Sequence, residues 1–252
     1  MFEWSSYKSQ VFTTLASAVA GVVSWGLLGT YRDTPVPQYN TNYASFLITG
    51  ILVANLVLPL SNGLINRLSP WTIETVLMTG LKGPTYVIGS SAWGYLLSVL
   101  LFSPQLFVSV YLFHLHLVVN ILSLLLSLAI STVIIFSLGM IATGMRLVTK
   151  VTDPITWSVI FAAQLLAGMT FPIQHLNDYL PGLSNVSWIL PQTWIYHLIR
   201  LSTLDGASVF DPELLLGLAT GSSYAMVLLV LSGMLFRWGL NRAKREGTIG
   251  WY

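Results

Sequence analysis

Residues 83–145 read GPTYVIGSSAWGYLLSVLLFSPQLFVSVYLFHLHLVVNILSLLLSLAISTVIIFSLGMIATGM and contain no Asp, Glu, Lys or Arg. Because a transmembrane helix needs about 20 predominantly apolar residues, the stretch is too long for one crossing and suits two. We expect the chain to turn near His114 to His116, between helices over residues 86–112 and 118–142. The stretch therefore predicts a helical hairpin that crosses a membrane twice.

Composition extends this prediction to the whole chain. Only 8% of the residues are charged and 54% are hydrophobic, whereas an ordinary soluble domain is about 25% charged. Long uncharged runs alternate with short charged gaps. This pattern predicts an all-α integral membrane protein with six spans, at residues 11–29, 44–64, 86–112, 118–142, 155–171 and 214–237. The spans and their connections use up residues 1–252 as a single transmembrane domain, so we expect no catalytic domain and no enzyme.

The basic residues predict how the chain is oriented. Lys and Arg in short loops are retained on the cytoplasmic side of a membrane. If both termini are cytoplasmic, only Arg32 and Arg200 of the eleven Lys and Arg residues lie outside. We therefore expect a multi-pass protein of the plasma (cytoplasmic) membrane, in contact with its lipid. This topology accounts for the net charge of +2, which gives no support for nucleic-acid binding.

One segment between the fifth and sixth spans resembles neither a span nor an ordinary loop. Residues 170–200 read TFPIQHLNDYLPGLSNVSWILPQTWIYHLIR, and Pro172, Pro181 and Pro191 divide them into short pieces. Such pieces cannot cross about 30 Å of hydrocarbon, and proline interrupts any longer helix. The orientation places the segment outside, so we expect short re-entrant helices at the outer membrane boundary.

The inner loop between the second and third spans carries its own helix signals. Ser69 is a good N-cap, Pro70 suits the first helical position, and Glu74 lies near the positive end of the helix dipole. These signals predict a cytoplasmic helix over residues 70–79, with one apolar face formed by Ile73, Val76 and Leu77. That face either packs on the membrane surface or docks into a cytoplasmic partner.

Two other segments are less informative. Residues 1–10 mix aromatic with charged residues, which fits either an interfacial segment or a frayed terminus. The loop over residues 30–42 contains Pro35 and Pro37, so we expect it to be extended. Nothing in this loop indicates chemistry.

The chain lacks the residue patterns of most catalytic and metal sites. It has no cysteine, and its four histidines have no acidic partner at helical spacing inside a span, so we expect no metal site. A phosphate-binding loop is missing, so this chain does not hydrolyse ATP by itself. No expected span contains an acidic residue of the kind that ion-coupled carriers commonly use. The driving force for any transport should therefore come from another subunit.

A few polar residues inside the expected spans are candidates for a translocation path. Asn55 lies in the second span and Gln164 in the fifth, with Thr49 and Phe161 nearby. The alternative is an ordinary hydrogen bond between helices, which contributes about 0.6 kcal/mol in membranes. Both interpretations stay open at this point.

Three features together make the chain resemble a known family. They are YASFLITGI at residues 43–51, PWTIETVLMTG with its Glu74, and the outer segment from Phe171 and Pro172 through Pro181 and Pro191 to Arg200. In order, spacing and sidedness, these features resemble the membrane subunits of ATP-binding-cassette exporters, the ABC type-2 permeases that include drug, lipid and antibiotic-resistance exporters. The resemblance covers nearly the whole chain.

The resemblance implies a half-channel of six helices that pairs with a second copy or a sister permease, above two cytoplasmic ABC ATPase subunits. The chain itself would hold no cofactor, because ATP and Mg²⁺ would bind to the ATPase subunits. The helix over residues 70–79 would be the coupling helix that contacts the ATPase, through Pro70, Trp71, Ile73, Glu74, Val76 and Leu77.

The resemblance also implies roles for the spans and for the outer segment. The second and fifth spans would line the translocation path, with Thr49, Asn55, Phe161 and Gln164 as its candidate residues. The outer segment would cap the exit, through Phe171, Pro172, Pro181, Pro191 and Arg200.

The chain departs from the family in two places. Pro70 and Trp71 occupy positions where many relatives have glycine, and residues 1–10 are shorter than the amphipathic segment of polysaccharide exporters. The second departure favours a small amphiphilic substrate over a glycan. The alternative function is that of an ion-coupled carrier or channel that acts without an ATPase.

Overall fold

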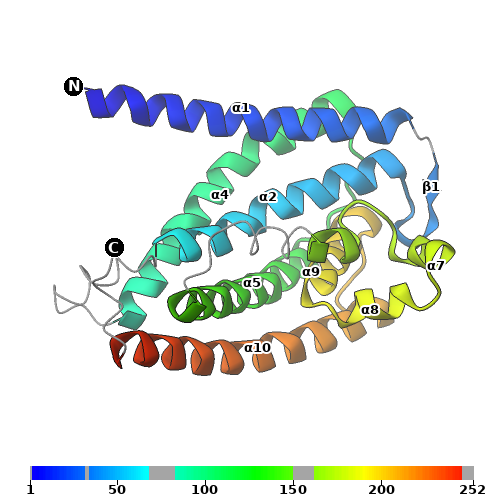
Figure 1. The fold of residues 1–252 in the computed structure, drawn as a ribbon. Helices are drawn as coiled ribbons and strands as arrows, with labels where there is room; N and C mark the ends of the chain where they lie inside the picture. Colours follow the sequence, from blue (N-terminus) through cyan, green and yellow to red (C-terminus); the bar gives the residue numbers. More distant parts are fainter. Residues whose placement is uncertain (1, 32–33, 68–82, 150–161, 246–252) are drawn as a thin grey trace.

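The computed structural model describes residues 2–31, 34–67, 83–149 and 162–245 (Figure 1). The long helices are α1 (Phe2–Tyr31), α2 (Tyr43–Arg67), α4 (Gly83–Phe113), α5 (Ile121–Thr149) and α10 (Pro212–Arg245). Short helices precede α10, namely η2 (Ile173–His175), α7 (Leu176–Tyr179), α8 (Leu183–Ile189), α9 (Pro191–Arg200) and the π-helical turn η3 (Leu201–Asp205).

Four stretches of helix are long and apolar enough to cross a membrane, at Phe12–Tyr31, Gly94–Phe113, Ile121–Met145 and Pro212–Ala243. They carry large apolar side chains that are exposed in the isolated chain, such as Leu28, Phe107, Leu125 and Met226. A helix that faced water would carry polar residues at such positions. The prediction of an all-α, multi-pass membrane protein is therefore confirmed at this level.

The predicted helical hairpin is present. α4 ends at Phe113, where His114 adopts a left-handed conformation with a φ of 48°, and α5 begins at Ile121. The intervening residues are extended and dock onto η3, because the amide of Val118 donates to the carbonyl of Thr203 at 3.0 Å. The turn thus falls at the two histidines, as predicted.

Two helix ends differ from the expected boundaries. The first span was expected to begin at residue 11, but α1 already begins at Phe2 and runs through residues 2–10 without a break. The fifth span was expected to reach residue 171, but the described part of its helix ends at Leu166. A turn follows in which Gly168 has a φ of 80°. This conformation ends the helix and favours glycine, because other residues are strained there.

The long helices form a bundle with α1 at one edge and α10 at the other (Figure 1). α1 packs against α2 and α4, whereas α10 packs along α5. The backbones of α5 and α10 are close at Gly144 and Gly239, because a Cβ on Gly239 would collide with the Gly144 carbonyl oxygen. Small residues at such crossings let membrane helices gain close van der Waals contact. α1 begins and α10 ends at the same end of the bundle, opposite the short helices.

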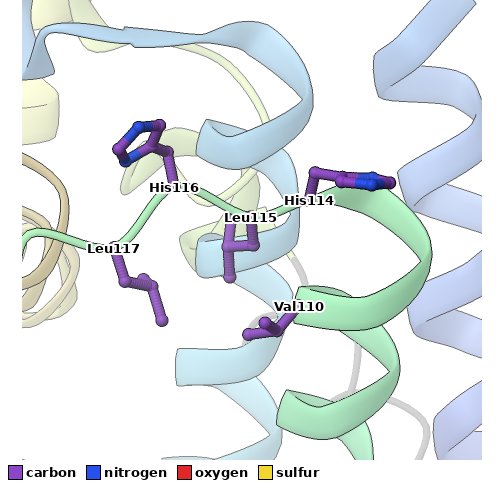
Figure 2. A pocket seen from close by; sticks show the side chains of 5 residues that line it. All are labelled: Val110, His114, Leu115, His116 and Leu117. Carbon is purple, nitrogen blue, oxygen red and sulfur yellow. The ribbon is translucent and has the colours of Figure 1, made fainter.

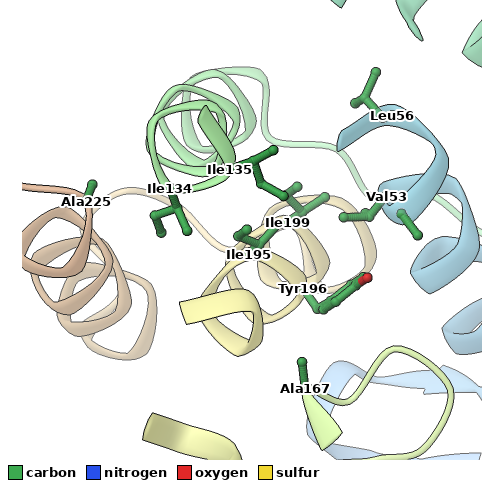
Figure 3. Close-up of a cluster of buried hydrophobic side chains, with 10 residues drawn as sticks. Val53, Leu56, Ile134, Ile135, Ala167, Ile195, Tyr196, Ile199 and Ala225 are labelled. Carbon is green, nitrogen blue, oxygen red and sulfur yellow. The ribbon is translucent and has the colours of Figure 1, made fainter. Parts of the chain in front are cut away.

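A buried apolar cluster lies where α9 meets the long helices (Figure 3). Ile195 and Ile199 of α9, Ile134 of α5 and Val53 of α2 belong to it, and each is at most 4% exposed. In a membrane such a cluster stabilises through close packing, because lipid tails are as apolar as these side chains. α9 is thus part of the packed interior.

The described part of the loop between α1 and α2 is a small hairpin. β1 (Pro35–Val36) pairs antiparallel with β2 (Thr41–Asn42) around the 3-10 helix η1 (Pro37–Tyr39). The hairpin buries Tyr39, which is 2% exposed. The expected extended loop is therefore a packed element that contributes a side chain to the interior.

Residues 170–200 form short helices that are separated at the predicted prolines. Pro172 precedes η2, Pro181 lies between α7 and α8, and Pro191 is the first residue of α9. The pieces gather at one end of the bundle (Figure 1). The prediction of short helices in place of a span is confirmed, whereas the side of the membrane on which they lie stays a prediction.

Candidate functional site

Arg200, the last residue of α9, has the most unusual environment among the predicted site residues. The side chains of residues 195–200 are all buried, and Arg200 itself is 2% exposed. Arginine is almost never fully buried unless it is paired. A buried charge is tolerated only where hydrogen bonds replace its lost water, so the partners of Arg200 define the site.

The guanidinium group is held by main-chain carbonyl groups. Nη1 donates to the carbonyl of Gly168 at 2.6 Å, and Nη2 donates to the carbonyls of Met169 at 2.8 Å and Phe46 at 3.1 Å. The Cζ atom also lies 3.6 Å from the centre of the Phe46 ring, within the range of a cation–π interaction. Nε is buried and has no hydrogen-bond partner among the described residues.

Local backbone features of α2 and of the turn after Leu166 make room for the guanidinium. A Cβ on Gly50 would lie 2.5 Å from Nη2 of Arg200 and would also collide with the Met169 carbonyl oxygen. The turn around Gly168 is also tied to the first residue of α2, because the hydroxyl of Tyr43 donates to the carbonyl of Thr170 at 3.1 Å. The turn, α2 and α9 thus meet at one side chain.

A second polar set lies beside Arg200 and joins the β1–β2 hairpin to α9 and α10. The hydroxyl of Tyr39 lies 3.0 Å from Nδ1 of His197, and Nε2 of His197 lies 3.8 Å from Oε1 of Glu213. Burial raises the pKa of Tyr39 to about 12. Burial, together with the positive charge of Arg200, lowers the pKa of His197 to about 4. The hydrogen bond between Tyr39 and Nδ1 therefore joins a protonated hydroxyl to a neutral imidazole, and Nε2 lies on the side of Glu213.

This order of carboxylate, imidazole and hydroxyl does not make a nucleophile here. The Tyr39 side chain is buried, so a substrate in solution cannot reach its hydroxyl. The rings of Trp188 and Trp194 pack against the imidazole edge to face, with centroids 5.1 Å and 6.1 Å away. The set fixes the hairpin against α9.

Three of the four residues predicted for a translocation path are described, and of these Thr49 and Gln164 are buried and Asn55 is half-buried. Thr49 is buried and donates to the carbonyl of Ser45 at 2.6 Å. Asn55 donates to Oε1 of Gln105 in α4 at 2.6 Å, which is the helix-to-helix hydrogen bond that the sequence left open. Gln164 is buried as well. A role of these residues in transport stays a prediction, and Phe161 lies outside the described residues.

The predicted ATPase-coupling residues also lie outside the described residues. They are Pro70, Trp71, Ile73, Glu74, Val76 and Leu77, within residues 68–82. Their assignment to a coupling helix stays a prediction.

The predicted outer-cap residues are found in different environments. Phe171 and Pro181 are exposed, Pro191 is half-buried, and Pro172 and Arg200 are buried. The sequence singled out Arg200 as one of two basic residues on the outer side of the membrane, and that side stays a prediction. The structure places it inside the protein, because three carbonyl groups and an aromatic ring replace its water.

A pocket of about 420 Å³ lies at the turn between α4 and α5, lined by Val110 and residues 114–117 (Figure 2). His114 and His116 both line this pocket, but their side chains point away from each other. Within the described ranges, no group of three His, Cys, Asp or Glu residues could hold a metal ion. The residues that line this pocket do not include Arg200, Tyr39 or His197, so the pocket is separate from the polar sites described above.

Comparison with known proteins leaves the family open. No protein-family model matches the chain, and no curated protein matches it. The function is thus inferred from the residues and their arrangement.

Proposed function

We propose that the chain is the permease subunit of an ABC type-2 exporter. With a second permease it forms the path for a small amphiphilic substrate, and ATP hydrolysis on two separate ATPase subunits drives transport. The observation that carries this proposal is the order of elements, in which a segment of short helices (residues 170–200) follows the fifth apolar run and precedes the last long helix. This order matches the family that the sequence resembles.

The arrangement of the helices supports a six-span topology with both termini on the cytoplasmic side. α1 begins and α10 ends at the same end of the bundle, and the short helices lie at the other end (Figure 1). The end of α5 meets the end of α10 at Gly144 and Gly239, whereas the turn at Gly168 contacts Arg200 among the short helices. We place the short helices outside and the protein in the plasma membrane.

The composition of the apolar helices supports an external source of energy. Phe12–Tyr31, Gly94–Phe113 and Ile121–Met145 contain no Asp, Glu, Lys or Arg. Proton and sodium relays in membranes use such residues, which are costly at mid-bilayer unless they serve a function. ATP and Mg²⁺ on the partner subunits would supply the driving force.

Copurification tests the proposal. An ABC ATPase should copurify with this chain, and Ile73→Glu should release it because the substitution places a charge on the apolar face of the coupling helix. Thr75→Glu is the matched control, because a helix over residues 70–79 places Thr75 on the opposite face. Retention of the ATPase by Ile73→Glu would contradict the coupling role.

Transport in proteoliposomes tests the class of protein. The chain should transport only when the ATPase and ATP are present. Transport by the chain alone, without nucleotide, would instead establish an ion-coupled carrier or channel.

A further inference from the structure

Arg200 joins three segments that are far apart in the sequence. It belongs to α9, but its Nη atoms donate to carbonyl groups outside that helix. These carbonyls belong to Phe46 in α2 and to the turn at Gly168 and Met169. We propose that Arg200 is an internal latch, which makes α9, the 167–170 turn and the first turns of α2 move as one body. The latch goes beyond the proposed function and does not depend on it.

The geometry requires a guanidinium group and not merely a positive charge. Two Nη atoms divide three carbonyl oxygens between them, at distances of 2.6 to 3.1 Å, while the planar group lies over the Phe46 ring. Arginine presents its donors in a rigid fork that can stack on an aromatic face, whereas lysine is a compact point charge. Lysine at this position would keep the charge but could not reproduce the fork and the stacking together.

The carbonyl groups in turn need a donor from outside their own segment. Gly168 and Met169 follow the end of the helix at Leu166, where main-chain carbonyls have no partner within the helix. In a membrane protein an unpaired carbonyl away from water is costly. Arg200 satisfies both groups, so removing its side chain loosens the turn as well as α9.

The close packing around Gly50 makes the connection to α2 short and rigid. Because Gly50 has no Cβ, the Met169 carbonyl and Nη2 of Arg200 can both reach the surface of α2. Phe46 lies one helical turn before Gly50 and provides both a carbonyl and its ring. The three segments therefore share one set of contacts, which must break together if any one segment is to move.

Hydrogen exchange of the purified full-length chain in nanodiscs tests the latch. Arg200→Ala should raise amide exchange about tenfold or more in residues 164–170, in α9 and in the first turns of α2. Amides of the α5 and α10 crossing around Gly144 and Gly239 should keep their protection. Arg237→Gln is the matched control, because it removes an exposed arginine from α10 and should change none of these rates.

Guanidinium ion at low concentration provides a second readout. It should slow exchange again in Arg200→Ala, because it fits the site that the deleted side chain leaves, and sodium chloride at equal ionic strength should not. Arg200→Lys should show intermediate exchange. A uniform rise of exchange in all helices, or a rise in α9 without one in the turn and α2, would overturn the latch.

The wild-type chain keeps the proposal testable if Arg200→Ala fails to fold. Under increasing urea, the amides of the three segments should show one common opening free energy. Different opening free energies for α9, the turn and the first turns of α2 would show that they do not move as one body.

Discussion

Replacing Gly50 by alanine is a direct test of how closely α2, Arg200 and the 167–170 turn are packed. The added Cβ would lie 2.5 Å from Nη2 of Arg200 and would overlap the carbonyl oxygen of Met169. Neither neighbour is the free end of a flexible chain, because Met169 contributes its main chain and the guanidinium is held by three hydrogen bonds. We expect the turn to be pushed away from α2.

The cost of Gly50→Ala follows from the contacts that it breaks. Overpacking a well-packed interior costs about 1–3 kcal/mol, and a lost hydrogen bond to a charged group costs about 1.5–3 kcal/mol. Alanine recovers up to about 1 kcal/mol, because its helix propensity is higher than that of glycine. The free energy of unfolding should therefore fall by about 2–4 kcal/mol.

Unfolding in mixed micelles, followed by circular dichroism and tryptophan fluorescence, measures this loss. Gly233→Ala in α10 is the matched control, because a Cβ there would meet nothing within 4 Å. The control should be neutral or more stable by up to about 1 kcal/mol. If Gly50→Ala were as stable as Gly233→Ala, the turn and Arg200 would not pack on α2 as described.

Three further perturbations have definite expected outcomes. The pKa of His197 is lowered to about 4 in the folded chain, so below about pH 6.5 the unfolded chain binds more protons than the folded chain. The free energy of unfolding should therefore fall as the pH drops from about 6.5 towards 4. Thermal melts measured across this range should show the decrease in the wild-type chain and lack it in His197→Phe. Asn55→Leu removes the hydrogen bond that Oε1 of Gln105 accepts from Asn55, and a double-mutant cycle with Gln105→Leu should give a coupling of about 0.6 kcal/mol. Gly239→Ala should separate α10 from α5 at Gly144 and lower the unfolding free energy by about 1–3 kcal/mol, as measured by urea titration in micelles.

Features with a local cause could be predicted from the sequence. The absence of charge over residues 83–145 is enough to require apolar helices, and the breaks at Pro172, Pro181 and Pro191 follow from the missing amide hydrogen of proline. Each signal lies within the segment that it shapes. The helical class and the short pieces of residues 170–200 can therefore be predicted from the sequence alone.

The Arg200 site could not be predicted, because the groups that accept its hydrogen bonds belong to the main chain. The guanidinium binds carbonyl groups of Gly168, Met169 and Phe46, and any residue type has a carbonyl group. The sequence shows an arginine at the end of an amphipathic segment, which charge counting assigns to the outside. Only the fold brings α2 and the turn to that arginine.

Tyr39 was missed for a related reason. Its loop has two prolines and no apolar run, so it contains no periodic pattern from which burial could be inferred. The burial comes from the β1–β2 hairpin, which turns Tyr39 towards His197 at a separation of more than half the chain. Long-range contacts of single side chains leave no trace in local patterns.

The location of the polar contacts follows from the lengths of the helices. A long membrane helix satisfies its own backbone, whereas a helix of one or two turns leaves most of its terminal groups without an internal partner. Accordingly, side chains from elsewhere bond to the main chain at the short helices and their turns: Tyr43 to Thr170, Ser123 to Ala207, and Arg200 to Gly168. Breaks in the helices thus create a need for donors, and the buried arginine satisfies two carbonyl groups at one of these breaks with a single side chain.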